Sequence, residues 1–134
     1  MPHNEGMLNT ISAVAGADLS GKLFYGVALV NNATPPPGVN CVVGTAAKAI
    51  AGVLQNNPLS GQAAEIQVSG TTKVAISANQ AIVGGTTFLD LDVGGTFTVH
   101  ATGTIVAQAI ESCPSSTTIQ IISAILKPSN LPTA

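Results

Sequence analysis

One stretch, AGVLQNNPLSGQAAEIQVSG from Ala51 to Gly70, restricts the fold of this chain more than any other. An apolar run leads into a polar turn, NNPLSG, and then into residues that alternate between apolar and polar. Such alternation is typical of a strand with one covered face, and Asn, Pro and Gly favour a chain reversal. We therefore expect a strand, a turn and a second strand, with Ile66 and Val68 in a core and Glu65 and Gln67 on the outer face.

The rest of the sequence repeats this pattern of short apolar runs separated by turn residues. The clearest further runs are 22–30, 71–77, 97–99, 104–112 and 117–127. About 8 to 10 short strands with turns every ~8 to 12 residues are typical of a small all-β barrel or sandwich. We expect mostly antiparallel strands, with a hairpin turn at Ser69 and Gly70.

Two segments are alternative candidates for a helix, and the shorter one is GADLSG, where Asp18 could begin a turn. The alanines of GTAAKAIAGVLQ, residues 44–55, favour helix. Gly52 and the turn residues on either side suit strands better, so a short strand is the favoured prediction here.

The last apolar run, TTIQIISAILK at 117–127, has β-branched residues on both of its faces. This composition is typical of a central strand that is covered on two sides. We therefore expect the run to be buried on both faces.

The pattern divides the chain into three parts. We expect an N-terminal arm at 1–16, a single β domain at 17–127 and a C-terminal tail at 128–134. The two ends lack periodicity, and we expect them to become ordered on a partner.

Composition excludes several classes of function. Charged residues make up 7% of the chain, whereas about 25% is typical, so partner subunits are expected to cover much of the surface. Four lysines and no arginine offer no bidentate clamp for phosphate, so nucleic-acid binding is not expected. No apolar run reaches the ~18 residues of a membrane span, and the N-terminus lacks the pattern of a secretory signal. We expect synthesis and use in a cytoplasm.

Few side chains offer metal chemistry. Asp90 and Asp92 in DLDVGG stand two apart and share a face if the segment is a strand. The later ligands that a calcium loop requires are missing, however. His3 and His100 have no metal-ligand spacing with the cysteines, so we expect no metal and no cofactor.

Catalytic motifs are missing as well. The sequence has no G-x-S-x-G elbow and no glycine-rich phosphate loop, so we expect no enzyme and no catalytic residue. A hydrolase remains the enzymatic alternative, and it requires His100 beside an acid and a serine. Cys41 and Cys113 are expected to be small buried hydrophobic residues in a reducing compartment.

Four segments carry a family resemblance. AGADLSGKLFYGVAL, IAGVLQNNPLSGQAAEIQVSGTTKVAIS, GTIVAQAIESC and TTIQIISAIL follow one another between about residues 15 and 126. Together they resemble the small capsid decoration, or cement, proteins of tailed phages, in which a GVLQN-P--G--A-V-V-G--KV core is the most recognisable part. The chain departs from that pattern at NNATPPPGVNC and across TFLDLDVGGTFTVHATG.

The resemblance implies a non-enzymatic and commonly trimeric protein. Such proteins lie on the outer surface of an expanded icosahedral head and clamp neighbouring subunits of the major capsid protein. The expected partners are therefore the major capsid protein and further copies of the chain. An extended, uncharged arm can add a strand to an exposed sheet edge. The expected capsid contacts are Asn9, Thr10, Ile11, Ser12, Ala13 and Val14.

Two other classes remain as alternatives. The first is another virion part of the same β class, namely the base of a head fibre or a tail component. The second is a carbohydrate-binding β module, which normally presents exposed aromatic rings. Tyr25 is the single tyrosine and tryptophan is missing, so the second alternative is poorly supported.

Overall fold

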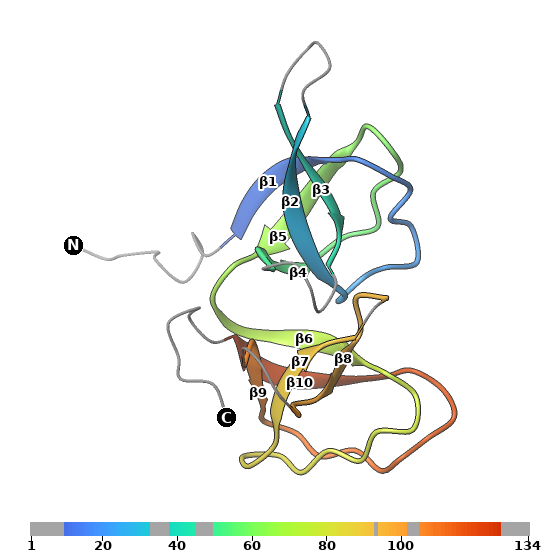
Figure 1. The fold of residues 1–134 in the computed structure, drawn as a ribbon, viewed down its shortest axis with the longest axis vertical. Coiled ribbons are helices and arrows are strands. Elements are labelled where there is room, and N and C mark those ends of the chain that lie inside the picture. Colours follow the sequence, from blue (N-terminus) through green and yellow to red (C-terminus); the bar gives the residue numbers. More distant parts are fainter. Residues whose placement is uncertain (1–9, 33–37, 45–49, 93, 102–104, 127–134) are drawn as a thin grey trace, which may run out of the picture.

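The computed structural model of the chain is all-β, as the sequence predicts (Figure 1). It describes residues 10–32, 38–44, 50–92, 94–101 and 105–126, and these contain ten strands. Within these ranges there is no helix long and apolar enough to cross a membrane. The strands are β1 (Thr10–Ala15), β2 (Gly26–Asn32), β3 (Gly38–Val43), β4 (Gly52–Leu54), β5 (Ala63–Gln67), β6 (Gly70–Ile76), β7 (Phe88–Leu91), β8 (Phe97–Val99), β9 (Ala107–Ala109) and β10 (Gln120–Leu126).

The strands form two closed barrels of five strands each. The first barrel has the order β1-β3-β2-β4-β5, and the second has the order β10-β6-β8-β7-β9. In Figure 1 the first barrel lies above the second. All pairings are antiparallel except those of β1 with β3 and of β6 with β8. The prediction of a small, mostly antiparallel barrel fold is therefore confirmed.

The sheet begins earlier in the chain than the sequence indicates. Thr10–Val14, which we assigned to an arm, pair residue by residue with β5 and form part of the first barrel. Ala13 and Ala15 face the core of that barrel, so β1 has an alternating pattern whose small side chains hide its periodicity. Residues 1–9 and 128–134 lie outside the described part of the chain.

The strand, turn and strand predicted at Ala51–Gly70 is present as the antiparallel pair of β4 and β5. The Asn56 side chain bridges the turn. Its Nδ2 donates to Ala63 O at 3.1 Å, and its Oδ1 accepts from Glu65 N–H at 3.1 Å. Ile66 is fully buried as expected, but Val68 lies beyond the end of β5 and is 36% exposed, so its predicted place in the core is wrong.

The hairpin predicted at Ser69 and Gly70 is absent. β5 pairs with β1 and β4, whereas β6 pairs with β10 and β8, so this turn carries the chain from one barrel to the other. The Gln67 side chain holds the crossover by donating to Ser69 O at 3.0 Å and to Thr71 O at 2.7 Å. A local turn signal does not distinguish a hairpin from such a corner, because distant partners decide where each strand pairs.

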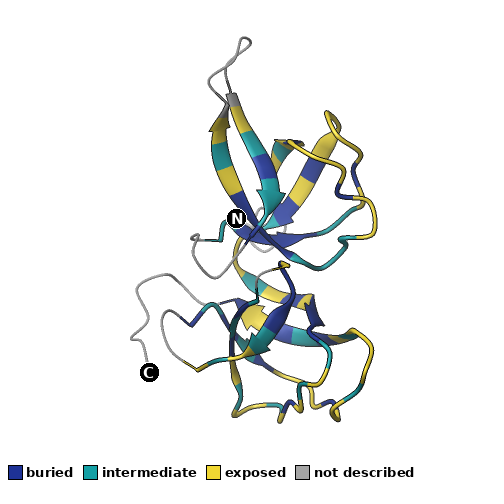
Figure 2. Cartoon of the chain, turned by 45° about the vertical axis from the view of Figure 1, so that its right-hand side comes forward, coloured by how far each residue is buried: buried dark blue, intermediate teal, exposed yellow. Residues whose placement is uncertain are grey.

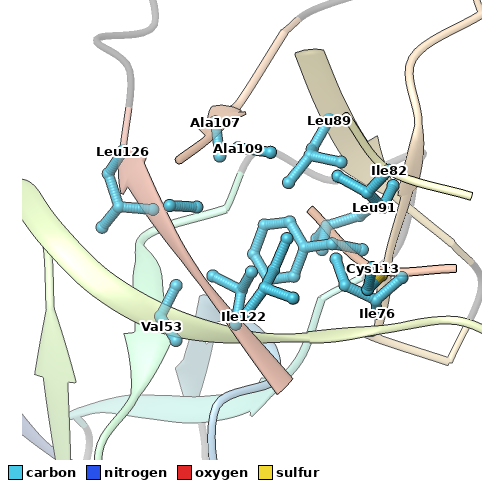
Figure 3. Packing of buried hydrophobic residues seen from close by; sticks show 13 residues of the cluster. Val53, Ile76, Ile82, Leu89, Leu91, Ala107, Ala109, Cys113, Ile122 and Leu126 are labelled. Atoms are coloured by element: carbon cyan, nitrogen blue, oxygen red, sulfur yellow. The ribbon is translucent and has the colours of Figure 1, made fainter. Parts of the chain in front are cut away.

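Each barrel has its own apolar cluster, but the two clusters meet. The first contains Val27, Cys41 and Ile66. The second contains Ile76 and Ile122, together with Val53 from β4 of the first barrel. Figure 3 shows Val53 beside Ile122 at the edge of this second cluster. The two barrels, which are built from the predicted domain at 17–127 together with Thr10–Ala15 of the predicted arm, therefore share apolar packing.

Backbone contacts hold the barrels together at the turn between β7 and β8 and at β6. Gly26 N–H donates to Gly95 O at 2.8 Å, and Ala75 N–H donates to Phe24 O at 3.0 Å. Gly95 has a φ of +91°, and a Cβ at this position would collide with Val43 Cγ1. A Cβ on Gly26 would lie 2.5 Å from Leu91 Cδ2. Glycine is required here because the two barrels approach each other at backbone distance.

We predict that Gly95→Ala lowers the free energy of unfolding by about 2–3 kcal/mol, because it adds a backbone strain and a collision with Val43. Gly94→Ala is the matched control, since a Cβ on Gly94 meets nothing within 4 Å and its φ is not positive. Urea unfolding of both variants checks this prediction. Equal stability of the two variants would contradict it.

Candidate functional site

The predicted contact segment lies along one strand of the first barrel. Thr10–Val14 belong to β1, and Asn9 falls outside the described residues. Ile11 is 39% exposed and Val14 is 48% exposed, while Ala13 packs against the core. The segment is thus a strand of the barrel with exposed aliphatic side chains, and its contact with a capsid stays a prediction.

The edge of β1 that faces β3 is only partly paired within the barrel. Ala15 N–H donates to Gln62 O, on the β5 side, and Gly16 N–H donates to Cys41 O, on the β3 side. Backbone groups alternate between the two sides of a strand, so those of Ser12 point toward β3, as those of Gly16 do. The pairing with β3 covers Val14 and Ala15 alone. Among the described residues, Ser12 therefore has no strand partner on this side.

An acid and a histidine meet on the second barrel. The β7–β8 hairpin pairs Asp90 with Thr98, and His100 follows two residues later on the same face. His100 Nδ1 lies 3.0 Å from Asp90 Oδ2, and the two side chains are 5% and 19% exposed. With the Nδ1–H tautomer, the ring donates a hydrogen bond to the Asp90 carboxylate, and Nε2 is then the acceptor atom of the neutral ring. Both residues were candidates from the sequence, but the sequence did not pair them, because the register of β7 with β8 brings them together.

His100 Nε2 is buried and has no hydrogen-bond partner in the described part of the chain. A hydrolase of the serine type requires a hydroxyl at this atom. In the described part of the chain, Asp90 is the acid beside His100 that the hydrolase alternative requires. No serine hydroxyl lies at His100 Nε2 in the same part. Within the same ranges no group of three His, Cys, Asp or Glu side chains is arranged to hold a metal ion.

Asp92 takes a different partner from Asp90. Ser77 Oγ lies 3.1 Å from Asp92 Oδ2 and 2.6 Å from Thr96 Oγ1. Asp92 N–H donates to Thr96 O at 2.8 Å, which closes the turn that contacts the first barrel. The two aspartates of DLDVGG therefore each hold a neighbouring strand or turn: Asp90 contacts His100, and Asp92 contacts Ser77 and Thr96.

The two cysteines are free and buried in separate clusters. Burial raises the pKa of the Cys41 thiol to about 11, and burial also raises the pKa of Cys113. Reactive cysteines have lowered pKa values, so neither thiol has the environment of a nucleophile. The sequence prediction of small buried hydrophobic residues agrees with their positions.

We predict that Asp90 and His100 stabilise the second barrel as a pair. Asp90→Asn and His100→Ala should each lower the free energy of unfolding by about 1–3 kcal/mol, because the first replaces a charged acceptor by a weaker neutral one and the second leaves the Asp90 carboxylate without its partner. The double variant should lose less than the sum of the two, with a coupling energy of about 1 kcal/mol or more.

Urea unfolding of the four proteins of this double-mutant cycle checks the prediction. Glu65→Gln serves as the control, because its side chain is exposed on β5. If the losses of unfolding free energy caused by Asp90→Asn and His100→Ala simply add up in the double variant, the contact between the two side chains contributes nothing to stability.

Comparison with known proteins reveals one informative likeness. No family model matches the sequence, and no curated protein matches it. Three chains of solved structure match the fold, among them the crystal structure of the head fiber gp8.5 N base in bacteriophage phi29. That match has a TM-score of 0.66 and 14% sequence identity, and it covers 92% of this chain and 97% of the other. The chain therefore shares its fold, over 92% of its length, with a protein of a phage head.

Proposed function

We propose that this chain is a structural, non-enzymatic protein of a tailed-phage head, and that it binds the outer surface of the expanded shell as a decoration protein. The observation that supports this proposal most strongly is the fold that the chain shares, over 92% of its length, with a phage head fibre base. The resemblance of residues 15–126 to capsid decoration proteins supports the same class independently. The proposed partners are the major capsid protein and two further copies of the chain, in a homotrimer made in the host cytoplasm.

The surface chemistry supports a partner that is a protein. Only 7% of the residues are charged, and many large aliphatic side chains on both barrels are more than a third exposed. Figure 2 shows exposed positions along strands of both barrels. A surface of this kind suits contact with other protein subunits better than contact with polyanions or free solvent.

Strand addition at β1 is the proposed mode of binding. The edge of β1 at Ser12 faces away from β5, and Ile11 and Val14 beside it are exposed. An extended loop of the shell protein can pair with this edge through backbone hydrogen bonds and cover the aliphatic side chains. In this proposal β1 keeps its place in the barrel and receives a strand from the shell.

A second candidate, the base of a head fibre, is favoured by the likeness to the phi29 protein, which is a head fiber base. Both candidates attach to the head surface. A decoration protein stabilises the shell by itself, whereas a fibre base also carries a fibre.

We predict that the purified chain sediments with expanded heads of the phage that encodes it and not with unexpanded heads. Bound shells should also withstand a higher temperature before they release their DNA, if the role is decoration. Co-sedimentation and thermal release assays measure both effects. Binding without any gain in shell stability would favour the fibre base, and the lack of binding to either shell would refute attachment to the head.

We predict that Ser12→Pro weakens shell binding at least tenfold. Proline removes the N–H that points to the open side of β1 and leaves the β5 pairing of Ile11 and Ala13 intact. Ser60→Pro is the control, because Ser60 stands second in a turn closed by Gln62 N–H and Leu59 O, where proline is favoured. Equal shell binding by the two variants would exclude strand addition at β1.

A further inference from the structure

The outer face of β10 is unusually apolar for a barrel. Strands of a barrel alternate between core and exterior, and Ile122, Ala124 and Leu126 point into the second barrel. The alternate residues Ile121 and Ile125 face outward and are 45% and 37% exposed. This outcome differs from the sequence prediction, which expected both faces of the strand to be covered.

Neighbouring strands extend this apolar area. Ile110 lies opposite Ser123, since its N–H donates to Ser123 O at 2.9 Å. Gln108 pairs with Ile125 on one side and with Phe88 on the other, so Phe88 faces outward on the same surface. We call this area the β10 surface. It consists of Phe88, Ile110, Ile119, Ile121 and Ile125, which are 37–47% exposed.

One positive and one negative side chain border the β10 surface, on opposite sides and at the same height. Lys73 of β6 pairs with Ser123 of β10, on the side away from β9. Glu111, which follows β9, accepts from the N–H of the same Ser123 at 2.6 Å. The pKa of Glu111 is lowered, first by its hydrogen bonds to Ser123 and last by Lys73. The carboxylate is therefore charged at neutral pH.

We propose that the β10 surface joins copies of this chain around a symmetry axis parallel to β10. In such a ring every copy has the same orientation, so the Lys73 side of one copy faces the Glu111 side of the next. The isoleucines of all copies then meet near the axis. In a dimer whose two-fold axis runs perpendicular to β10 along the surface, Lys73 of one copy would instead face Lys73 of the other. Such like-charge contact is unfavourable.

The charge arrangement favours a second copy over a different partner. The β10 surface carries both a lysine and a glutamate, so Lys73 of one copy can pair with Glu111 of the next. The inference deepens the proposed homotrimer by naming its contact, and it is tested without any capsid. Failure of shell binding and failure of self-association are therefore separate results.

The first test measures the mass of the purified chain in solution by sedimentation equilibrium. The wild-type protein should have a multiple of the 13.3 kDa chain mass, three times for the proposed trimer. Ile121→Lys should reduce the mass to that of a single chain, because it places like charges around the axis. Leu59→Lys is the matched control at another exposed aliphatic residue, in a turn of the first barrel, and should keep the wild-type mass.

The second test exchanges the charges. Lys73→Glu alone and Glu111→Lys alone should each raise the dissociation constant at least tenfold, since each opposes like charges between neighbouring copies. The double variant Lys73→Glu/Glu111→Lys should recover most of the affinity. Circular dichroism confirms that each variant is folded.

Three results would overturn the inference. The first is a wild-type protein that is a single chain at every concentration. The second is an Ile121→Lys variant that keeps the wild-type mass. If that variant also loses shell binding, the β10 surface contacts the capsid and not a second copy. The third is a double charge variant that associates no better than the single variants.

Discussion

The close backbone contact between the two barrels at Gly26 and Gly95 determines what the rest of the molecule can do. The edge of β1 at Ser12, which has no strand partner toward β3 among the described residues, belongs to the first barrel, and the β10 surface belongs to the second. A protein that binds a shell through one barrel and binds its own copies through the other needs a rigid connection between the two barrels. Gln67 at the crossover and Val53 in the core of the second barrel stiffen it further.

Polar side chains in this protein mostly fasten the chain to itself. The amide of Asn56 bridges the β4–β5 turn, Asp90 holds His100, and Ser77 contacts Asp92 near the joint. Groups that would serve catalysis elsewhere are thus engaged in barrel contacts. This pattern suits a protein whose task is to hold a shape against a partner, as we propose for the head surface.

Much of the fold follows from the sequence because period-two alternation and turn residues are local signals. The β4–β5 pair and the burial of Ile66 were predictable in this way. The division into two barrels was not, because Ser69 and Gly70 give the same signal for a hairpin and for a crossover. The pairing of β6 with β10, which decides between them, joins residues far apart in the chain. The small side chains of β1 hid a strand within the expected arm.

The candidate surfaces were partly predictable. Residues 10–14 were named from their uncharged, extended character, but their orientation required the register with β5 and β3. The isoleucines on both faces of β10 predicted a strand that is covered on two sides, and the exposed outer face contradicts that prediction for the single chain. No internal layer covers that face, since Ile121 and Ile125 face outward, and this is the physical reason to expect neighbouring copies there.

An electron cryomicroscopy map of the head of the encoding phage tests the central claim most directly. We predict density for both barrels on the outer surface of the expanded shell, with the β1 edge against the major capsid protein and with the β10 surfaces of neighbouring copies in contact. A head that lacks this density, in virions shown by mass spectrometry to lack the chain, would contradict it.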